Sequence, residues 1–438
     1  VRRRLQSAGF EIEKRPGFGR KREMLAGRLR EERGLTRRKP WYATHHSSPA
    51  KPGARVAVIG AGIAGASMAH ALRQVGMTPI VLEAKTPASG ASGNPAGMIM
   101  PRLDAGDTPD AHFHSAAYLY TAQLLSTLQE QASTRFFVEC GAILHAQDER
   151  ETIRQQKLIA MHALPDDWMR AHHDGLFFPK AGVVYPPAFV RALLGETPVH
   201  QCEVSQLRFV ENLWRVGFTN GENETFDAVV IANGLDALRF AQCHSLPLAG
   251  AAGQIDFFPD AEMPEHARMF GAYIAPCPNF SGKGGGLVIG ATYAPIEIGN
   301  QPTFTAEATQ TNINAVRKVL PDLADTLDPQ ASIPRASIRC VTPDWMPIAG
   351  PIPNLGFYAR AYDGIRDGRL IDYPAGQTLP GLYILSGLGS RGLVTAPLAA
   401  AVIAAEIAAA PSPVAHTVCE ALHPARFFIR ELRKAKPG

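Results

Sequence analysis

One stretch of the chain, residues 55–97, limits the possible fold more than any other. Residues 55–59 form a short apolar run rich in β-branched residues, which is typical of a buried parallel strand. Three glycines at Gly-x-Gly-x-x-Gly spacing follow, then a helical pattern over residues 66–75 and a second strand pattern over residues 78–82. Glu83 ends that second strand. This order of elements predicts a βαβ unit that binds a dinucleotide.

Each glycine of this unit has its own physical role. Gly60 makes the tight turn, Gly62 lets the backbone approach a pyrophosphate, and Gly65 lets the helix pack closely on the strand. The helix N-terminus then faces the phosphates, and Glu83 accepts hydrogen bonds from the ribose hydroxyls. NAD, FAD and S-adenosylmethionine can all use such an acidic residue, so these glycines alone do not choose the cofactor.

Composition favours a globular protein with a basic N-terminal segment. The chain has 438 residues, enough for two or three domains, of which 46% are hydrophobic and 19% charged. The net charge is +4, but residues 1–50 alone carry 14 basic and 5 acidic residues. Such a segment is either solvated surface or a contact for a polyanion.

Several classes of protein are disfavoured. The six cysteines are dispersed without a Cys-x-x-Cys pair, which predicts free thiols in a reducing cytoplasm and no metal site. The most apolar stretch, residues 395–410, is rich in alanine and interrupted by Glu406, so we expect a buried helix and no membrane span. The first residue is valine, which fits a fragment of a longer protein.

Other segments are assigned by their periodicity and turn residues. Residues 1–8, 111–131, 149–163, 186–194 and 306–319 predict helices. Residues 10–14, 199–207, 213–219, 224–231, 254–258, 269–275 and 287–290 predict strands. Two glycine-rich loops, residues 90–97 and 387–393, can face a phosphate or a flat ring, although the composition of the first fits a plain turn equally well.

The motifs together resemble a known family. The segments 56–65, 90–97, 226–234 and 387–393 resemble FAD enzymes of the D-amino-acid-oxidase and glycine-oxidase type. Segments 338–350, 387–393 and 421–427 are more similar to the oxidase half of the bifunctional tRNA 5-methylaminomethyl-2-thiouridine biosynthesis (MnmC) family. Segments 3–10 and 17–24 resemble the last strands of that family's methyltransferase domain, whose S-adenosylmethionine motif would lie upstream of residue 1. One departure is Ala252, where this family carries an arginine before Gly-Gln.

The resemblance implies an α/β plus α+β fold, with a Rossmann-like FAD domain and an interleaved antiparallel-sheet substrate domain. The FAD domain would comprise residues 55–135, 183–246 and 346–412, and the substrate domain residues 136–182 and 247–345. Residues 1–42 would be a methyltransferase remnant, 43–54 a linker and 413–438 a basic C-terminal tail. The implied FAD-binding residues are Gly60, Gly62, Ile63, Ala64, Gly65, Glu83, Ser92, Gly93, Asn94, Gly97, Val204, Ala232, Asn233, Gly234, Gly389, Ser390, Gly392 and Leu393.

The implied reaction is oxidative removal of the carboxymethyl group from 5-carboxymethylaminomethyl-(2-thio)uridine at the tRNA wobble position. The resemblance places Arg339 on the substrate carboxylate, where an arginine gives bidentate geometry that lysine cannot. Arg391, in the second glycine loop, is the next candidate. Tyr273 and Tyr293 could line the pocket, with core packing as the competing reading. The expected cofactor is FAD, the partner tRNA, and the location the cytoplasm, with no metal and no membrane.

Two alternatives from other classes stay open. The first is a small-molecule amine oxidase that acts on glycine, sarcosine or proline. The second is a methyltransferase or a tRNA-binding module without redox chemistry. The basic segments near both chain ends, residues 2–39 and 426–436, favour the tRNA-modifying oxidase, because polyanion binding needs phosphate contacts.

Overall fold

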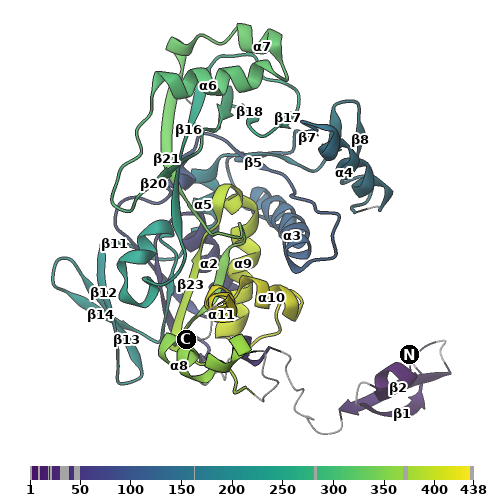
Figure 1. Cartoon of the computed structure of the whole chain (residues 1–438), viewed down its shortest axis with the longest axis vertical. Helices are drawn as coiled ribbons and strands as arrows, with labels where there is room; N and C mark the ends of the chain where they lie inside the picture. The colour runs from purple at the N-terminus through teal and green to yellow at the C-terminus, as the bar shows by residue number, and fades with distance from the viewer. Residues whose placement is uncertain are drawn as a thin grey trace.

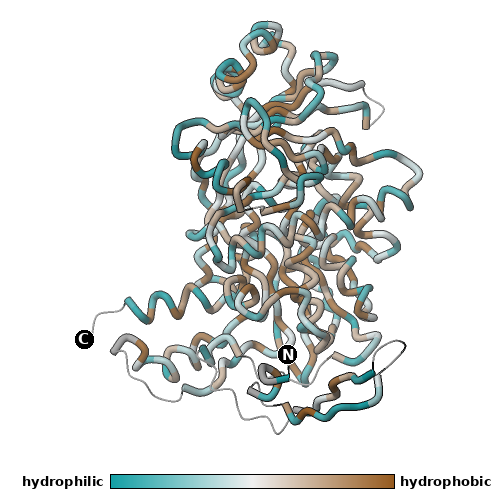
Figure 2. The backbone as a smooth tube through the Cα atoms, turned by 90° about the vertical axis from the view of Figure 1, so that its right-hand side faces the viewer, coloured by the Kyte–Doolittle hydropathy of each residue, from teal (hydrophilic) through white to brown (hydrophobic). Residues whose placement is uncertain are grey.

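The computed structural model describes residues 2–7, 10–17, 19, 22–29, 39–43, 50–161, 163–280, 284–367 and 373–434. In Figure 1 a sheet flanked by helices occupies the lower part of the body, and a larger mostly antiparallel sheet lies above it. Figure 2 shows the most hydrophobic segments gathered in the middle of the body, where helices meet the sheets. The expected combination of a Rossmann-like sheet and an antiparallel sheet is therefore confirmed.

A six-stranded sheet contains the predicted βαβ unit. Its order is β11-β4-β3-β15-β23-β22, and only β22 runs antiparallel to its neighbour. The chain moves from β3 to β4 on one side and later to β15 on the other, so the strand order reverses beside β3. A ligand crevice is expected outside the carboxyl ends of the strands at this point. The strands are β3 Arg55–Ile59, β4 Thr78–Glu83, β11 Val199–Gln201, β15 Ala228–Ile231, β22 Ile348–Pro353 and β23 Thr378–Ser386.

Four helices pack on or beside this sheet. They are α2 (Ile63–Gln74), α3 (Pro109–Gln131), α5 (Pro186–Leu194) and α9 (Gly392–Ile407). Helix α2 packs against both α5 and α9, and α3 packs against α9. Within the described chain one helix, at 389–407, is long and apolar enough to cross a membrane, and 67% of that stretch is buried inside the molecule. Such burial is typical of a core helix that is apolar on all sides.

Three strand predictions, those for 199–207, 224–231 and 269–275, were wrong in their extent. The segment 224–231 contains two strands, because Asp227 lies between β14 (Asn223–Phe226) and β15 and receives a hydrogen bond from the Arg55 N–H at 2.7 Å. The segment 199–207 likewise divides into β11 and β12 (Val204–Val210). Strands β12, β13 (Leu213–Phe218) and β14 form a separate antiparallel sheet at the side of the body. Periodicity did not show that the chain changes sheets.

The larger sheet has the order β20-β16-β19-β18-β17-β7-β9-β8, with β21 paired to β16. The predicted strand 269–275 is divided between β17 and β18. The strands are β7 Ala142–His145, β8 Arg170–His172, β9 Gly175–Phe178, β16 Ala249–Pro259, β17 Ala267–Met269, β18 Tyr273–Cys277, β19 Gly286–Gly290, β20 Ala294–Ile296 and β21 Ile333–Val341. A third small sheet joins β5 (Gly97–Ile99), β10 (Gly182–Val184) and β6 (Phe137–Val138).

A buried carboxylate attaches a helix to the larger sheet. Asp256 on β16 is 0% exposed. Its oxygens accept hydrogen bonds from Thr309 Oγ1 at 2.6 Å and Asn312 Nδ2 at 2.6 Å, both on α6 (Ala306–Arg317), and from Ser332 Oγ at 2.8 Å. A buried polar group must be hydrogen-bonded, so these contacts fix α6 against β16. The remaining helices of this half are α4 (Glu149–Ala160) and α7 (Pro321–Asp325).

The C-terminal segment, expected as a basic tail, forms two packed helices in its described part. Helices α10 (His416–Leu422) and α11 (Ala425–Lys434) pack beside α8 (Leu355–Ala361) and the end of α9. Arg426 is 5% exposed and donates to both carboxylate oxygens of Asp344, each at 3.0 Å. The apolar side chains Phe427 and Ile429 are buried with it. An apolar stripe therefore overrides the basic composition of this segment.

The N-terminal segment forms a small unit of its own. Helix α1 (Arg2–Ser7) is followed by the antiparallel hairpin of β1 (Phe10–Pro16) and β2 (Glu23–Leu29), and the predicted helix and strand are thus confirmed. Figure 1 shows this hairpin beside the body. Trp41, in contrast, is 5% exposed and packs in the body among Tyr358 and Tyr362. Residues 44–49 of the predicted linker lie outside the described residues.

Replacing Asp344 by asparagine should destabilise the folded protein, because the Arg426 guanidinium would stay buried without its counter-charge. Removing one partner of a buried ion pair costs about 3–5 kcal/mol. Urea unfolding should show the loss. The matched control is Arg430→Ala: Arg430 also contacts Asp344, at 3.1 Å, but its side chain is 47% exposed, so its loss should cost about 1 kcal/mol or less. Equal effects of the two substitutions would contradict this view of the ion pair.

The same ion pair sets a pH dependence. Burial raises the pKa of Asp344, but the hydrogen bond and charge of Arg426 outweigh it and hold the pKa below its usual value. The stabilisation is therefore present above the unfolded-state pKa of about 3.9 and is lost as the pH falls through the lower folded-state pKa. The stability difference between the wild type and Asp344→Asn should shrink over that acidic range.

Candidate dinucleotide and carboxylate site

Two helix N-termini meet at the carboxyl edge of the parallel sheet. Helix α2 begins at Ile63 after the first glycine turn, and α9 begins at Gly392 after the loop that follows β23. A Cβ atom on Gly392 would lie 3.4 Å from Ile63 Cγ2, so the two helix starts are in contact distance. Each helix N-terminus carries partial positive charge and N–H groups without an intrahelical acceptor. Their meeting makes a site suited to an anion such as pyrophosphate.

The glycines of the first turn differ in what surrounds them. Gly60 has a φ of +102°, and a Cβ there would lie 2.9 Å from the carbonyl oxygen of Ala232. A Cβ on Gly65 would lie 1.8 Å from the Gly60 carbonyl oxygen. These two glycines therefore serve close backbone packing. Among the described residues, only Ser92 Oγ lies within 4 Å of a Cβ on Gly62, at 3.3 Å, so Gly62 leaves an open side on which a ligand can approach.

Glu83 supports the glycine turn directly. Its carboxylate accepts hydrogen bonds from the N–H of Ala61 at 2.7 Å and the N–H of Lys85 at 2.8 Å. The next strand lies alongside, because the Cys202 N–H donates to the Glu83 carbonyl oxygen at 2.9 Å. Val204 begins β12 two residues later. Glu83 therefore ends β4, and Val204 lies close to that end. Contacts of these two residues with a cofactor remain a prediction.

The segment that follows β15 lies against the glycine turn at Gly60. It contains a buried polar atom that has no hydrogen-bond partner among the described residues. Ala232, Asn233 and Gly234 follow the strand, and Asn233 Oδ1 is buried without a hydrogen-bond partner among the described residues. Because buried oxygens are rarely left unpaired, this atom marks a place for an outside donor. The paired helix starts, the open side of Gly62 and this oxygen all fit a bound dinucleotide.

The loop at residues 90–94 is clasped by an arginine that the sequence did not reveal. Arg335 on β21 donates from Nη1 to Asn94 Oδ1 at 3.0 Å and from Nη2 to the Gly90 carbonyl oxygen at 2.7 Å. A Cβ on Gly93 would lie 2.5 Å from Arg335 Nη2 and 2.6 Å from the Ala88 carbonyl oxygen, and the backbone oxygen makes glycine necessary there. Ser92 Oγ of the same loop accepts from the Ile63 N–H at 2.9 Å. The larger sheet is thus tied to the loop that borders the first helix start.

Gly97 joins the two glycine loops. A Cβ at this position would lie 2.2 Å from Leu393 Cδ1, which belongs to the first turn of α9. The small size of Gly97 thus lets Leu393 pack against the start of β5. These two predicted residues contact each other, whereas Gly389 and Ser390 lie in the 3-10 turn just before α9.

Arg339 lies four residues after Arg335 on β21, so both side chains leave the same face of the strand. Its Nη1 donates to Ser390 Oγ at 3.0 Å, and its Nη2 donates to the Thr292 carbonyl oxygen at 3.0 Å. Tyr293 lies beside it, with the ring centroid 5.8 Å from Cζ. No carboxylate forms an ion pair with Arg339 within the part of the chain that the structure describes. The guanidinium can therefore receive an external carboxylate.

Burial shapes the ionisation of this group. It lowers the pKa of Arg339, while the neighbouring phenols of Tyr273 and Tyr293 raise it. Burial in turn raises the pKa of Tyr273 to about 12, against the opposing effect of Arg339. The tyrosine thus stays protonated near neutral pH, whereas arginine keeps its charge. Tyr293 therefore lies beside Arg339, and Tyr273 is near enough for the two charges to interact, while a role of either tyrosine in lining a pocket stays a prediction.

A second residue missed from the sequence is Gly253. A Cβ there would lie 1.7 Å from Arg339 Nη2 and 2.7 Å from the Thr292 carbonyl oxygen, so a side chain would have to displace both the guanidinium and the backbone. The strand register explains this contact, because Gly253 is opposite Ser337 in the β16–β21 pair. The preceding Ala252 is opposite Ile338. Only the pairing of the two strands, which lie far apart in sequence, could have revealed this requirement.

Arg391 belongs to a separate cluster of positive charge. Burial, together with the charges of Arg102 and Arg154, lowers the pKa of Arg391 to about 10. Arg102 Nη1 is 3.2 Å from His114 Nε2, and burial and then Arg102 lower the pKa of that histidine to about 4. Near neutral pH the histidine is therefore uncharged and the arginines are protonated. The positive charge around Arg391 favours the binding of anions. This cluster does not include Arg339.

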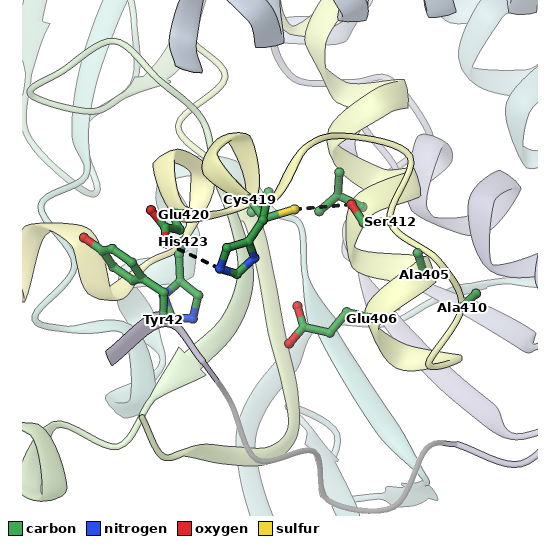
Figure 3. Close-up of a pocket in the computed structure, with 11 residues that line it drawn as sticks. Tyr42, Ala405, Glu406, Ala410, Ser412, Cys419, Glu420 and His423 are labelled. Carbon is green, nitrogen blue, oxygen red and sulfur yellow. Dashed lines mark hydrogen bonds and ion pairs between the residues drawn. The ribbon is translucent and has the colours of Figure 1, made fainter. Parts of the chain in front are cut away.

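Two other features lie away from these loops. A cavity of about 220 Å³ is bordered by Tyr42, Glu406 and Cys419, as Figure 3 shows. Glu406 is 14 residues after Gly392 on α9, so it lies about 21 Å along the helix from the glycine loop. Separately, His172, His173 and Asp174 have ligand atoms within 4.8 Å of one another and could hold a metal ion. Arg268 donates to Asp174 at 3.1 Å, and its positive charge disfavours a cation there.

Comparison with known proteins places the chain in a family. The family model described as FAD dependent oxidoreductase (DAO) matches residues 55–406, and an S-adenosyl-L-methionine-dependent methyltransferase model matches residues 1–30. Proteins named tRNA 5-methylaminomethyl-2-thiouridine biosynthesis bifunctional protein MnmC are 35% identical in Chromohalobacter salexigens and 34% in Magnetococcus marinus. Each alignment includes 99% of this chain. The chain spans 64% and 68% of the length of these two relatives.

Solved structures share the fold. A glycine oxidase from Geobacillus kaustophilus has a TM-score of 0.65 at 20% identity, with 85% of this chain and 99% of that chain covered. An iminodiacetate oxidase from Chelativorans has a TM-score of 0.63 at 20% identity, with 82% and 97% covered. The family match establishes FAD as the cofactor. The chain therefore belongs to the DAO family of FAD-dependent oxidoreductases, and within it to the MnmC proteins.

Proposed function

We propose that this chain oxidatively removes the carboxymethyl group from 5-carboxymethylaminomethyl-(2-thio)uridine at the wobble position of tRNA, in the cytoplasm. The product would be 5-aminomethyl-(2-thio)uridine. The observation that carries the proposal is Arg339, a half-buried arginine beside the glycine loops with no carboxylate partner in the described chain. The names of the MnmC relatives supply the tRNA substrate class.

The residues present suggest how the substrate would be held. Its modification is an N-substituted glycine, with a carboxylate on the carbon to be oxidised. Arg339 would bind that carboxylate with two parallel hydrogen bonds and so fix the position of the adjacent carbon. The chemistry that FAD supplies when bound is acceptance of a hydride from this carbon. Water then hydrolyses the resulting substrate imine to the aminomethyl-uridine and glyoxylate.

The protein would also hold the cofactor through its own residues. The helix starts at Ile63 and Gly392 would face the pyrophosphate, and Glu83 would face the ribose hydroxyls. Ser390 would connect the loop at the cofactor to Arg339, the arginine proposed to hold the substrate carboxylate, because the Ser390 hydroxyl accepts a hydrogen bond from Arg339. This hydrogen bond would link the cofactor site to the substrate site.

A small-molecule amine oxidase is the second candidate. The structural neighbours include a glycine oxidase and an iminodiacetate oxidase, which share the fold. The same Arg339 could hold the carboxylate of a free amino acid. Anaerobic mixing with modified tRNA and, separately, with N-methylglycine or glycine decides between the two, because only the true substrate bleaches the flavin at a catalytic rate.

Gly62→Val should yield a folded protein without FAD. The protein itself offers only Ser92 Oγ near the new side chain, so the loss should come from blocked access of the phosphates. The control is Gly65→Ala, whose Cβ would lie 1.8 Å from the Gly60 carbonyl oxygen and should disturb the fold itself. Flavin released by heat measures the cofactor, and circular dichroism measures folding. Full flavin content in Gly62→Val would contradict the assignment.

Arg339→Ala should keep its flavin and lose reduction by carboxymethylaminomethyl-tRNA. A misplaced donor carbon costs on the order of 100-fold in rate. Arg339→Lys keeps the charge without the fork and should also be impaired. The measurement is anaerobic flavin bleaching with tRNA isolated before this step of modification.

The outcome also tests Arg391. If Arg339→Ala bleaches at the wild-type rate while Arg391→Ala does not, the carboxylate lies on Arg391. If Arg339→Ala instead loses FAD, the residue serves the cofactor loop through Ser390.

Binding of tRNA should weaken as salt increases, because cationic side chains release counterions when they neutralise phosphates. Removing residues 1–38 should flatten that dependence, since this segment is strongly basic. The cut leaves Lys39, which pairs with Glu420 at 2.7 Å, and the buried Trp41 in place. Filter binding at several salt concentrations gives the slope. An unchanged slope would show that the segment is only solvated surface.

A further inference from the structure

An exposed pair of aromatic rings lies next to Arg339. The Tyr293 and Trp345 centroids are 6.0 Å apart, with the ring planes tilted by 51°. Tyr293 is 49% exposed and Trp345 is 57% exposed. The rings come from different segments, since Tyr293 lies between β19 and β20 and Trp345 lies between β21 and β22. The three side chains thus run in the order Arg339, Tyr293, Trp345.

The backbone at Trp345 is held in an unfavourable conformation. Its φ is +61°, a region that bulky side chains rarely adopt. The surrounding turn enforces this conformation, because the Trp345 N–H donates to the Thr342 carbonyl oxygen at 3.2 Å and Thr342 Oγ1 donates to the Met346 carbonyl oxygen at 2.8 Å. Asp344, one residue earlier, is fixed by Arg426. Strain of this kind persists where the structure over-determines it and is concentrated at ligand sites.

Packing in the protein core does not explain why a tryptophan stands at position 345. The other three tryptophans of the chain are buried or half-buried, and Trp41 and Trp214 are only 5% and 2% exposed. A large apolar ring kept in solvent by a strained turn gains little from the protein core. Aromatic rings exposed beside a cation are a common means of binding unstacked nucleic-acid bases.

We propose that Trp345 and Tyr293 form a nucleobase site that stacks on the uracil ring carrying the carboxymethylaminomethyl group. This inference rests on the proposed function. In that substrate four bonds separate the carboxylate carbon from the uracil ring, a span of about 5 Å when extended. With the carboxylate on Arg339, the uracil therefore reaches Tyr293, whose centroid is 5.8 Å from the Arg339 Cζ, and then Trp345. A wobble base must leave its stack to reach a buried cofactor, and the rings replace the lost stacking.

The site would give the enzyme a preference for a base-linked glycine. A free amino acid offers the same carboxylate and amine but has nothing to stack on Trp345. The two substrates therefore share the contact with Arg339 and differ only at the aromatic pair. This difference is what an experiment can measure.

The test uses the full chain with FAD bound, as wild type, Trp345→Ala and Trp345→Phe. Anaerobic flavin reduction is followed over a range of concentrations of carboxymethylaminomethyl-tRNA. Trp345→Ala should raise the half-saturating tRNA concentration by on the order of 10-fold, because stacking contributes strongly to base binding. Trp345→Phe should restore most of it. Phe209→Ala, which removes a 40% exposed ring from the separate side sheet, should behave as wild type.

N-methylglycine provides the control for a structural role. Its reduction of the flavin, or its perturbation of the flavin spectrum on binding, should be the same in wild type and Trp345→Ala. An equal loss with both substrates would overturn the nucleobase site and show that Trp345 only supports Arg339. Wild-type half-saturation with tRNA in Trp345→Ala would overturn it as well.

Two further results separate this inference from the proposed function. If tRNA fails to reduce the wild-type flavin, the proposed function is wrong and the nucleobase site is overturned with it. If tRNA reduces wild type and Trp345→Ala alike, only the nucleobase site is wrong. Tryptophan fluorescence gives an independent reading, because the quenching that tRNA causes in wild type should be reduced in Trp345→Phe. Equal quenching in both proteins would contradict a base stacked on Trp345.

Discussion

The candidate site depends on one strand pairing, that of β16 with β21. Nine residue pairs, from Ala249 with Val341 to Phe257 with Ile333, hold β21 in the antiparallel sheet. From this fixed strand Arg335 reaches the loop at Gly90 and Asn94, and Arg339 reaches Ser390 in the other glycine loop. One strand of the larger sheet therefore contacts both glycine loops. A shift of its register by one residue would turn both arginines to the opposite face.

Small residues make these close contacts possible. The side chains of Arg335 and Arg339 occupy the space that a Cβ on Gly93 or Gly253 would take, and Leu393 occupies the space beside Gly97. The glycines of the first turn act differently, since Gly60 and Gly65 bring two backbone segments together while Gly62 leaves space open. At most of these glycines other protein atoms fill the space that a Cβ would take, whereas at Gly62 that space is left for a ligand. This division explains why substitutions at neighbouring glycines should have different consequences.

The sequence predicted the local elements of the fold better than their long-range pairing. The βαβ unit was visible because its strand, glycine turn, helix and terminal acid are contiguous. The division of 224–231 between two sheets was not visible, because a single residue, Asp227, separates β14 from β15 and periodicity does not mark it as a break. The folded C-terminal helices were also missed, since the ion pair of Arg426 with Asp344 joins positions 82 residues apart. Arg335 and Gly253 were missed for the same reason, because their roles exist only once β16 and β21 are paired.

The charge of the site bears on how an amine could be oxidised there without a dedicated base. Arg339 near the aromatic pair and the cluster of Arg391 with Arg102 and Arg154 create a positive potential around the glycine loops. The effect of burial and such charge is visible in His114, whose pKa falls to about 4. A substrate ammonium group bound near these cations would be destabilised in the same way, whereas its carboxylate would be stabilised. The arrangement therefore favours the neutral amine, which is the form that can lose a hydride from the adjacent carbon.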